Sequence, residues 1–469
     1  MCMSSMSKNL IALSISMFLV ACVNTSDSGD SSTVPLPDPE PGALDSSFGS
    51  NGVVVIDLGS SFKSSAGKGL QLSSDGKILI GAETWPVGRA DSDFSLLRLN
   101  SDGSVDGSFN NANNNGVVVT DLDNFSNEHL ACMSVDSAGH ILLSGHKVSG
   151  GWDIANARYN ASGELDNSFG DNNSGISTTA FPVSGAGASI AYSKAIGMFP
   201  DNSFVVAGRT NNGGSFFDVA LARYDANGLI DISFNGVGTL NVDFNGGDDN
   251  ANAVAVVGNP SLSPDSSRIF VAGFANSSKS VGHGKDFLLM KYDISGQLDT
   301  TFNATDTMPG AVIMHQTQND AFNAIALQSD GKIVVAGTAG GINTMDFVLM
   351  RFNADGSLDT TFNGSGYKTT DLGGRNDEIT AIAIDSSGRI IAAGKTDSLN
   401  DAGDFAVVRY NSDGSEDLSF ADNGVLRVPV SAGEDVVTAL ALQGNGIYVL
   451  GSADSGSNNE KIAVLRVFQ

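Results

Sequence analysis

The sequence predicts an all-β protein assembled from a repeated unit of 58 to 68 residues. The phrase NADGSLDTTFNGSG at residues 353–366 returns with small edits along the chain. Runs rich in Val and Ile lie between the copies and are separated by Gly, Asn and Asp, a composition typical of strands and turns. The Phe of the phrase recurs at Phe48, Phe109, Phe169, Phe234, Phe302, Phe362 and Phe420. Such a regular spacing indicates a repeat architecture.

Each repeat is expected to contribute four strands. The first alternates small and apolar residues, as in NAIALQ from Asn323, and a polar turn follows it. The second is a β-branched run that ends in Gly, as in KIVVAG, which ends at Gly337. The third resembles DFVLMRFN from Asp346, and the repeated phrase leads from it into a fourth run such as GVVVTDL from Gly116. We predict no helix after residue 22.

Seven such units predict a seven-bladed β-propeller of four-stranded blades. The repeat region begins with a fourth strand at residues 52–58 and ends on a third strand at residues 461–468. The N-terminal strand would therefore lie beside the C-terminal strand and close the ring, which removes an exposed sheet edge. A linear solenoid is the alternative, but solenoids need distinct polar caps, and the sequence shows none.

The motifs DGSLDTTFNGSG, DGKIVVAG and DFVLMRFNADGSLD resemble the delta-60 repeat, a bacterial β-propeller-type repeat of exported proteins. The resemblance covers residues 41–469, with insertions before the middle strand of the third and fourth copies and Lys461 in place of Asp in the last copy. It implies the propeller fold and carries no assigned reaction.

The repeated phrase is expected to form a turn. Asn and Asp favour turn conformations, Gly supplies a positive φ, and Leu and Phe can anchor the turn between blades. The second Asp of each copy should accept backbone hydrogen bonds within the turn: Asp45, Asp106, Asp166, Asp231, Asp299, Asp359 and Asp417. A calcium loop is the alternative, although the spacing departs from D-x-[DN]-x-[DN]-G. These carboxylates could pair with a recurring third-strand cation: Arg98, Arg158, Arg223, Lys291, Arg351, Arg409 and Arg466.

The N-terminus reads as an export signal. Residues 1–21 contain one cation and a short apolar run, as a signal peptide does, and Leu19-Val20-Ala21-Cys22 resembles the lipobox of bacterial lipoproteins. We expect residues 1–21 to be removed, Cys22 to be lipidated, and residues 22–40 to form a Ser/Asp/Pro-rich tether. The protein would be anchored to the bacterial cell envelope, at the outer membrane because Val23 replaces a retention Asp. An ordinary secretory signal is the alternative.

The net charge of the 469-residue chain limits the classes of ligand that it can bind. Its formal net charge of −27 argues against nucleic acid, whose binding proteins present a basic face. Cations and basic ligands remain conceivable. A lipidated Cys22 would leave Cys132 unpaired, so we expect Cys132 to be a small buried residue. We expect the domain to be monomeric.

A second series of acids precedes the inner strands. If these carboxylates surround one mouth of the central channel, their mutual repulsion would favour a cation such as Ca²⁺ or a basic ligand. The alternative is that each acid holds its own loop through an Asx-type bond. We expect no other cofactor. The series comprises Glu128, Asp249, Asp320, Asp377 and Asp435, with Ser65 and Ala191 at the corresponding positions of two copies.

Catalytic motifs are scarce in the sequence. The five His form no HExxH pair and are expected to be surface or strand residues, and GxSxG, GxxxxGK[ST] and CxxC are absent. The connections between second and third strands vary in length, and Trp85 and Trp152 fall in them. Variable loops on a rigid scaffold are common recognition sites, where an exposed Trp can stack on a sugar. Packing of each Trp over its own blade is the alternative.

These observations favour a binding or scaffolding module for protein or glycan ligands on the variable-loop face, rather than an enzyme. One alternative is an envelope polysaccharide hydrolase or lyase, which a pocket with paired carboxylates would favour. The other is a purely structural surface protein.

Overall fold

The computed structural model describes residues 39–110, 116–123, 126–148, 150–182, 190–211, 216–244, 246–276, 284–341, 344–373, 376–397, 403–454 and 460–469. Pro39–Gln469 form one compact unit. The described ranges contain twenty-eight strands, no α-helix, and three short 3₁₀ helices, η1 (Asp171–Asn173), η2 (Pro264–Ser266) and η3 (Phe362–Gly364). The expected signal peptide, Cys22 and the tether up to residue 38 lie outside them.

Four sheets each hold four antiparallel strands in chain order. The first contains β2 (Phe62–Leu72), β3 (Ile78–Pro86), β4 (Asp93–Leu99) and β5 (Val117–Thr120). The second contains β14 (Asn250–Val257), β15 (Arg268–Ala275), β16 (Asp286–Asp293) and β17 (Ala311–Met314). The third contains β18 (Ala321–Leu327), β19 (Ile333–Gly341), β20 (Thr344–Phe352) and β21 (Tyr367–Thr370). The fourth contains β22 (Asp377–Ile384), β23 (Ile390–Thr396), β24 (Asp404–Tyr410) and β25 (Val425–Val428).

A larger sheet holds eight strands. One group of four is β6 (Asn127–Val135), β7 (Ile141–Val148), β8 (Trp152–Tyr159) and β9 (Ile176–Thr179). The other is β10 (Ile190–Met198), β11 (Phe204–Asn211), β12 (Asp218–Tyr224) and β13 (Thr239–Val242). Each group is antiparallel in chain order, and one parallel pair, Ile190 beside Trp152, joins the two.

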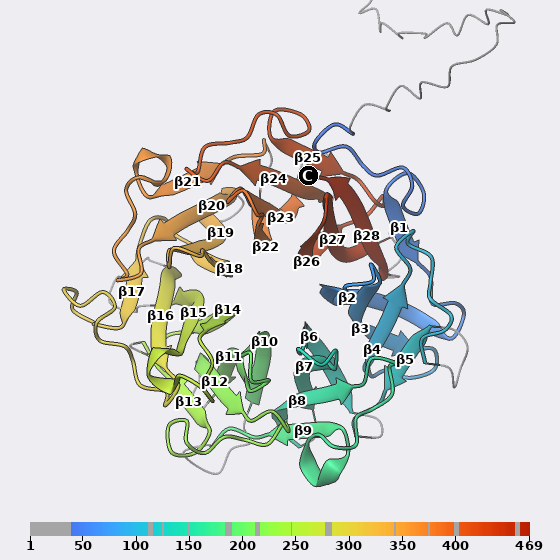
Figure 1. The fold of residues 1–469 in the computed structure, drawn as a ribbon, viewed down its shortest axis with the longest axis horizontal. Coiled ribbons are helices and arrows are strands. Elements are labelled where there is room, and N and C mark those ends of the chain that lie inside the picture. Colours follow the sequence, from blue (N-terminus) through green and yellow to red (C-terminus); the bar gives the residue numbers. More distant parts are fainter. Residues whose placement is uncertain are drawn as a thin grey trace, which may run out of the picture. The chain divides into compact units, whose positions relative to one another are not determined.

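The remaining sheet combines both ends of the repeat region. It holds β26 (Asp435–Gln443), β27 (Gly446–Asp454), β28 (Glu460–Phe468) and β1 (Val53–Ile56). β1 pairs antiparallel with β28, with Val53 opposite Leu465, so the N-terminal strand is the fourth strand of this sheet, as the sequence predicts. Figure 1 shows the sheets around a common centre, with β2, β6, β10, β14, β18, β22 and β26 innermost.

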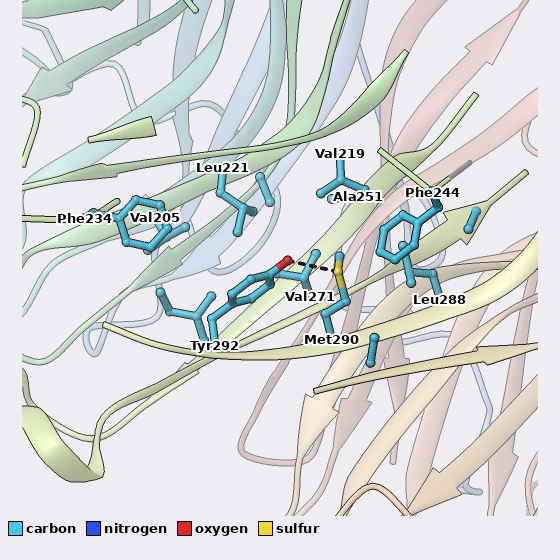
Figure 2. Close-up of a cluster of buried hydrophobic side chains, with 14 of the residues drawn as sticks. Val205, Val219, Leu221, Phe234, Phe244, Ala251, Val271, Leu288, Met290 and Tyr292 are labelled. Carbon is cyan, nitrogen blue, oxygen red and sulfur yellow. Dashed lines mark hydrogen bonds between the residues drawn. The ribbon is translucent and has the colours of Figure 1, made fainter. Parts of the chain in front are cut away.

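The hydrophobic core consists of layers between neighbouring sheets. In one layer, Val205 of β11 and Leu221 of β12 pack against Val271 of β15 and Met290 of β16, as Figure 2 shows. The hydroxyl of Tyr292 donates to Sδ of Met290 at 3.1 Å, so the phenol keeps a polar partner in this apolar layer. Because each sheet buries both faces against its neighbours, a long chain needs no single large core.

The repeated phrase forms the predicted turn in every copy. In one copy, Asp106 accepts hydrogen bonds from the backbone N–H (3.0 Å) and hydroxyl (2.6 Å) of Ser108, and Arg98 donates to the same carboxylate at 2.8 Å. Although burial opposes it, these bonds and Lys77 hold the pKa of Asp106 well below its usual range. The cation–carboxylate pairs are Arg98–Asp106, Arg158–Asp166, Arg223–Asp231, Lys291–Asp299, Arg351–Asp359, Arg409–Asp417 and Arg466–Asp45.

The turn also joins each repeat to the next. Phe109 is fully buried and lies against Gly163 of the following copy, where a Cβ would lie 2.7 Å from the ring and φ is +87°. The N–H of Asn110 donates to the carbonyl of Ser162 in the same following turn at 2.9 Å. In the last copy, the N–H of Ala421 donates to Pro41 at 2.9 Å. The phrase is repeated because each copy binds its neighbour.

Two smaller findings complete the fold. No helix formed by the described residues is long and apolar enough to cross a membrane. Cys132 is half-buried, not fully buried as expected from the sequence, because it lies at the β-bulge of β6. Desolvation raises the pKa of its thiol to about 12, and its Sγ donates to the carbonyl of Ser144 at 3.7 Å. The thiol is therefore a poor nucleophile.

Candidate functional site

The predicted acidic series does not converge on one site. Asp249 accepts from the N–H of Phe244 (2.6 Å) and of Asn276 (2.9 Å), and Asp435 accepts from the N–H of Val430 (2.7 Å). Comparable loop contacts hold the other three acids, through Ser126 to Glu128, Gln316 to Asp320 and Leu372 to Asp377. All five side chains are buried. Each acid therefore supports its own loop, which is the alternative that the sequence left open.

Four of these acids lie in small groups at the junctions between sheets. The groups are Asp93, Asp121 and Glu128; Asp218, Asp243 and Asp249; Asp286, His315 and Asp320; and Asp346, Asp371 and Asp377. The ligand atoms within a group lie within 4.8 Å of one another, and no group contains two members of the predicted series. In the first group Arg89 contacts Asp93 and Asp121 at 3.1 Å and already supplies a positive charge. Binding of Ca²⁺ stays a prediction.

The two tryptophans lie at strand ends, not in the variable connections. Trp85 is in β3 opposite Ser64, and Trp152 is the first residue of β8 opposite Val148. Both side chains are half-buried. The strands β3 and β8 thus continue into segments that the sequence predicted as connections. Each Trp lines a cavity.

The cavity beside Trp152 has a volume of about 450 Å³, and we call it the basic cavity. Its walls come from β2, β3, β6, β7, β8, β10 and β11. They are formed by Lys68, Glu83, His129, Leu130, Ala131, His146, Trp152, Tyr192, Ser193, Lys194 and Arg209. Apart from the two His, three cations face one carboxylate here, in a chain whose net charge is −27. The site therefore favours an anionic ligand.

Aromatic rings form one side of the basic cavity. Trp152 stacks on His146 with ring centroids 5.4 Å apart, and it lies 4.7 Å from the ring of Tyr192. The guanidinium of Arg209 lies over Tyr192 at 4.7 Å and over Phe217 at 4.4 Å. This packing holds the guanidinium in one orientation, so its charge is positioned before any ligand arrives.

Two histidines in this cavity differ in environment. Nδ1 of His129 donates to Oε1 of Glu83 at 2.8 Å, so the neutral ring carries its lone pair on Nε2. His146 lies opposite His129 across β6 and β7 and is buried. Burial first, and then repulsion from the protonated form of His129, from Lys194 and from Arg209, lower the pKa of His146 to about 3. His146 is therefore neutral at physiological pH, whereas His129 is oriented by a carboxylate as a proton-transfer group would be.

β-bulges direct two of the cations into the cavity. The register of β2 shifts between Gly67 and Gly69, and that of β10 shifts between Ser193 and Ala195, so Lys68 and Lys194 are the extra residues. A bulge re-aims the side chain of its extra residue and is frequent beside active sites. Desolvation and the positive charges of Arg209 and Lys68 lower the pKa of Lys194, which indicates that the cations are close together.

A second cavity of about 300 Å³ lies at Trp85, and we call it the Trp85 cavity. Lys63, the other bulge residue of β2, contributes to its wall together with Asp454 and Glu460 from β27 and β28. Burial and the negative charges of Asp454, Glu83 and Glu434 raise the pKa of Glu460, whereas Lys68 lowers it. This cavity is less basic than its neighbour.

Sequence reasoning identified the two tryptophans and missed the residues around them. His129, His146, Tyr192 and Arg209 belong to no contiguous motif, and the histidines were expected to be ordinary strand residues. A signal was present at the position after the repeated Gly of the second strand. That position holds Ala82, Phe274, Thr338 and Ser452 in four copies, and His146 and Arg209 in two neighbouring copies. The remaining copy has Lys395, which pairs with Glu434 outside the cavity.

Comparison with known families supports the fold. Five segments match a domain of unknown function described as a β-propeller, DUF5122: residues 73–109, 139–169, 200–234, 328–362 and 386–420. Each segment ends on the Phe of the repeated phrase. The chain carries β-propeller repeats. The narrower delta-60 assignment stays a prediction, and no curated protein matches the chain in sequence.

Several solved structures are similar to this β-propeller chain. A protein of unknown function from Dyadobacter fermentans is 11% identical with a TM-score of 0.47, and the match covers 89% of this chain and 98% of that one. The polysaccharide lyase Uly1 is 10% identical with a TM-score of 0.46, over 86% and 90% of the two chains. An ulvan lyase of the polysaccharide lyase family PL25 is 11% identical with a TM-score of 0.44, over 87% and 95%. These scores give no argument about activity.

Proposed function

We propose that this protein is a polysaccharide lyase that cleaves uronic-acid-containing chains by β-elimination in the basic cavity. The observation that carries the proposal is the convergence of Lys68, Lys194 and Arg209 on His129 and Tyr192 in an otherwise acidic chain. A uronate presents a carboxylate to such cations. In β-elimination, a base removes the proton from the neighbouring C5, and an acid protonates the glycosidic oxygen that leaves from C4.

The cations would bind the substrate carboxylate and stabilise the negative charge that develops on it as the C5 proton leaves. Arg209 is suited to this because the rings of Tyr192 and Phe217 fix its guanidinium. Groups held in place before the reaction stabilise a developing charge without reorganisation. Lys68 and Lys194 add point charges from the two bulges.

His129 and Tyr192 would perform the two proton transfers. Nε2 of His129 takes the proton from C5, because its Nδ1–H is held by Glu83. The electron pair of that C–H bond forms the C4=C5 double bond, and the C4–O4 bond breaks. The oxygen of the leaving sugar takes the proton of the Tyr192 hydroxyl. The products are a shortened chain and an unsaturated uronate.

Hydrolysis is the second candidate, and one observation favours it. Asp454 and Glu460 face each other across β27 and β28 in the Trp85 cavity. Directly opposed residues place their Cβ atoms about 4.5–5.5 Å apart, and glycosidases use a pair of nearby carboxylates. Among the described residues that line the basic cavity, Glu83 is the one carboxylate, and it already holds His129, so hydrolysis is not favoured there.

The test is a cleavage assay with a panel of polysaccharides: alginate, polygalacturonate, hyaluronan, chondroitin sulfate, ulvan and neutral dextran. A lyase produces an unsaturated uronate that absorbs in the ultraviolet, whereas a hydrolase produces reducing ends without that absorbance. We expect ultraviolet-absorbing product from at least one uronate polymer and none from dextran. Reducing ends without absorbance would replace the lyase proposal with hydrolysis.

Matched variants locate the reaction. Tyr192→Phe and His129→Gln should each lower kcat by about 10²–10⁴-fold, the usual range for a lost proton-transfer group. Tyr367→Phe on β21 and His140→Gln beside Asp136 are the controls, since neither residue lines the basic cavity. Full activity in Tyr192→Phe and His129→Gln would refute the assignment. Saturable binding of a uronate polymer without cleavage would support the binding module that the sequence favours.

The finer architecture is also a proposal: seven blades in a ring closed by β1. The pairing of β1 with β28 and the bond from Ala421 to Pro41 support it. A closed ring should unfold in one transition. Deletion of residues 41–58 should lower the melting temperature and expose an edge of β28, and an unchanged melting temperature would contradict closure.

We further propose that the protein is exported and lipid-anchored at Cys22, at the outer membrane. The lipobox-like LVAC sequence supports this, and an enzyme for large polysaccharides needs to meet them outside the cytoplasm. Metabolic labelling with a fatty acid should mark the wild-type chain and not Cys22→Ser. Equal labelling of both would refute the anchor.

A further inference from the structure

We infer that the Trp85 cavity is a second sugar subsite that binds an uncharged sugar next to the uronate held in the basic cavity. The inference rests on the proposed function for its catalytic meaning. The binding site itself is argued from its own geometry and can be tested without catalysis.

The two cavities adjoin along one strand. Glu83 lines the basic cavity and Trp85, two residues further along β3, lines the Trp85 cavity. Residues two apart on a strand point to the same side and lie about 6.5–7 Å apart. The charges of Glu83 and Lys68, which line the basic cavity, shift the pKa of Glu460 in the Trp85 cavity, so the two cavities are close to each other. A polysaccharide chain that leaves one cavity along β3 therefore meets the other.

The lining of the Trp85 cavity suits a sugar. Trp85 is half-buried, and its indole can stack on the apolar face of a pyranose ring. Among the described residues, none donates a hydrogen bond to the carboxylate of Glu460, so its oxygens can accept bonds from sugar hydroxyls. A ring stack by Trp85 combined with the acceptors of Glu460 is a chemistry that recognises hydroxyl-rich rings.

The charges of the two cavities indicate which sugar each one binds. Among the described residues, three cations and Glu83 line the basic cavity, whereas Asp454, Glu460 and Lys63 are the charged residues that line the Trp85 cavity. A second uronate would place its carboxylate near Glu460, whose pKa is already raised by burial and neighbouring acids. The substrate class is therefore a polymer in which a uronate alternates with an uncharged sugar. Hyaluronan has this pattern, and polygalacturonate, with a carboxylate on every ring, does not.

Fluorescence can observe this subsite directly, because the chain contains only two tryptophans. Trp152→Phe leaves Trp85 as the single reporter, and Trp85→Phe leaves Trp152. Each is combined with Tyr192→Phe to prevent cleavage and titrated with hyaluronan, chondroitin sulfate, ulvan and polygalacturonate. We expect hyaluronan to cause a saturable change in the fluorescence of Trp85. The affinity for polygalacturonate in the same titration should be at least tenfold lower. No change at Trp85 with any polymer of the panel, or equal affinity for hyaluronan and polygalacturonate, would overturn the inference.

Kinetics separate this inference from the proposed function. In the otherwise native chain, Trp85→Ala and Glu460→Gln should raise KM for long hyaluronan about tenfold and leave kcat within about twofold. Val87→Ala is the control, because Val87 is exposed on the same connection and does not line the cavity. A large loss of kcat in Glu460→Gln would instead assign Glu460 to hydrolysis and overturn the subsite. A saturable Trp85 signal without any cleavage would retain the subsite and refute the lyase.

Discussion

The inner strands β14 and β18 differ from β2 and β10 in the extra residue of the β-bulge. In β14 and β18 this residue is Asn252 or Asn323, and each side chain donates to a backbone carbonyl of the next sheet, at 2.9 Å to Phe322 and 3.0 Å to Ile379. In β2 and β10 it is Lys68 or Lys194, and both side chains line the basic cavity. One backbone position therefore has two uses.

The comparison shows how a repeat scaffold acquires a site. An Asn at the bulge joins neighbouring sheets and leaves no donor for a ligand. The corresponding residue of β6 is Ala131, which cannot donate and leaves space in the cavity. In β2 and β10, where the joining contact is absent, the same backbone position places a charged side chain in the wall of the basic cavity. The basic cavity lies beside β2, β6 and β10, whose bulge residues line the cavity instead of joining neighbouring sheets as Asn252 and Asn323 do.

The largest expected effect is a loss of catalytic activity when a cation of the basic cavity is replaced. Arg209→Gln should lower kcat/KM on the cleaved uronate polymer by about 10²–10³-fold, since it removes a fixed charge from the carboxylate. Arg209→Lys should recover only part of this loss, because an ammonium does not stack between Tyr192 and Phe217. Arg389→Gln is the control, as Arg389 pairs with Asp385 outside the cavity. Equal activity in Arg209→Gln and Arg389→Gln would show that the cavity is not the reaction site.

A smaller effect is expected on the structural side. Asn323→Ala should lower the free energy of unfolding by about 1–3 kcal/mol, because it removes bonds to Ile379 and Glu378 of the next sheet. Urea denaturation measures this, and cleavage should be unchanged. Lys194→Ala should show the opposite pattern, with weaker activity and unchanged stability. Loss of activity in Asn323→Ala at full stability would contradict the division of roles.

Most of the fold could be predicted from the sequence because its determinants recur. The Asp of each turn binds its own turn and one third-strand cation in every copy, so seven weak signals combine into a strong one. The relation of β1 to β28 followed from the strand type at each chain end. These features depend on local turn chemistry and on alternation along strands, which a sequence displays directly.

The site could not be predicted in the same way, because its residues do not recur. His129 and Arg209 come from different strands and meet only when two neighbouring sheets assemble. The register that places His146 opposite His129 depends on a bulge, which the strand pattern does not reveal. The acidic series recurs, and for that reason it indicated structure: Asp249 and Asp435 hold their own loops. In this molecule, residues that break the repeat are the better functional candidates.

The smallest expected effect concerns Glu128, a recurring acid at the junction beside the basic cavity. Burial raises its pKa to about 7, and the charges of Asp121 and Asp93 act in the same direction, whereas Ser126 opposes them. An unfolded Glu titrates near about 4.3, so the folded protein holds an extra proton between these values. The stabilising contribution is full below about pH 4 and is lost as the pH rises through about 7.

Glu128→Gln removes this dependence. The variant should match the wild type in free energy of unfolding near about pH 4 and exceed it by about 1–3 kcal/mol near about pH 8, since its amide never ionises. Glu164→Gln, on an exposed turn, is the control and should follow the wild type at both pH values. Urea denaturation across this range measures the difference. A deficit for Glu128→Gln at about pH 8 would mean that the ionised carboxylate stabilises the junction, as expected if a cation binds with Asp93 and Asp121.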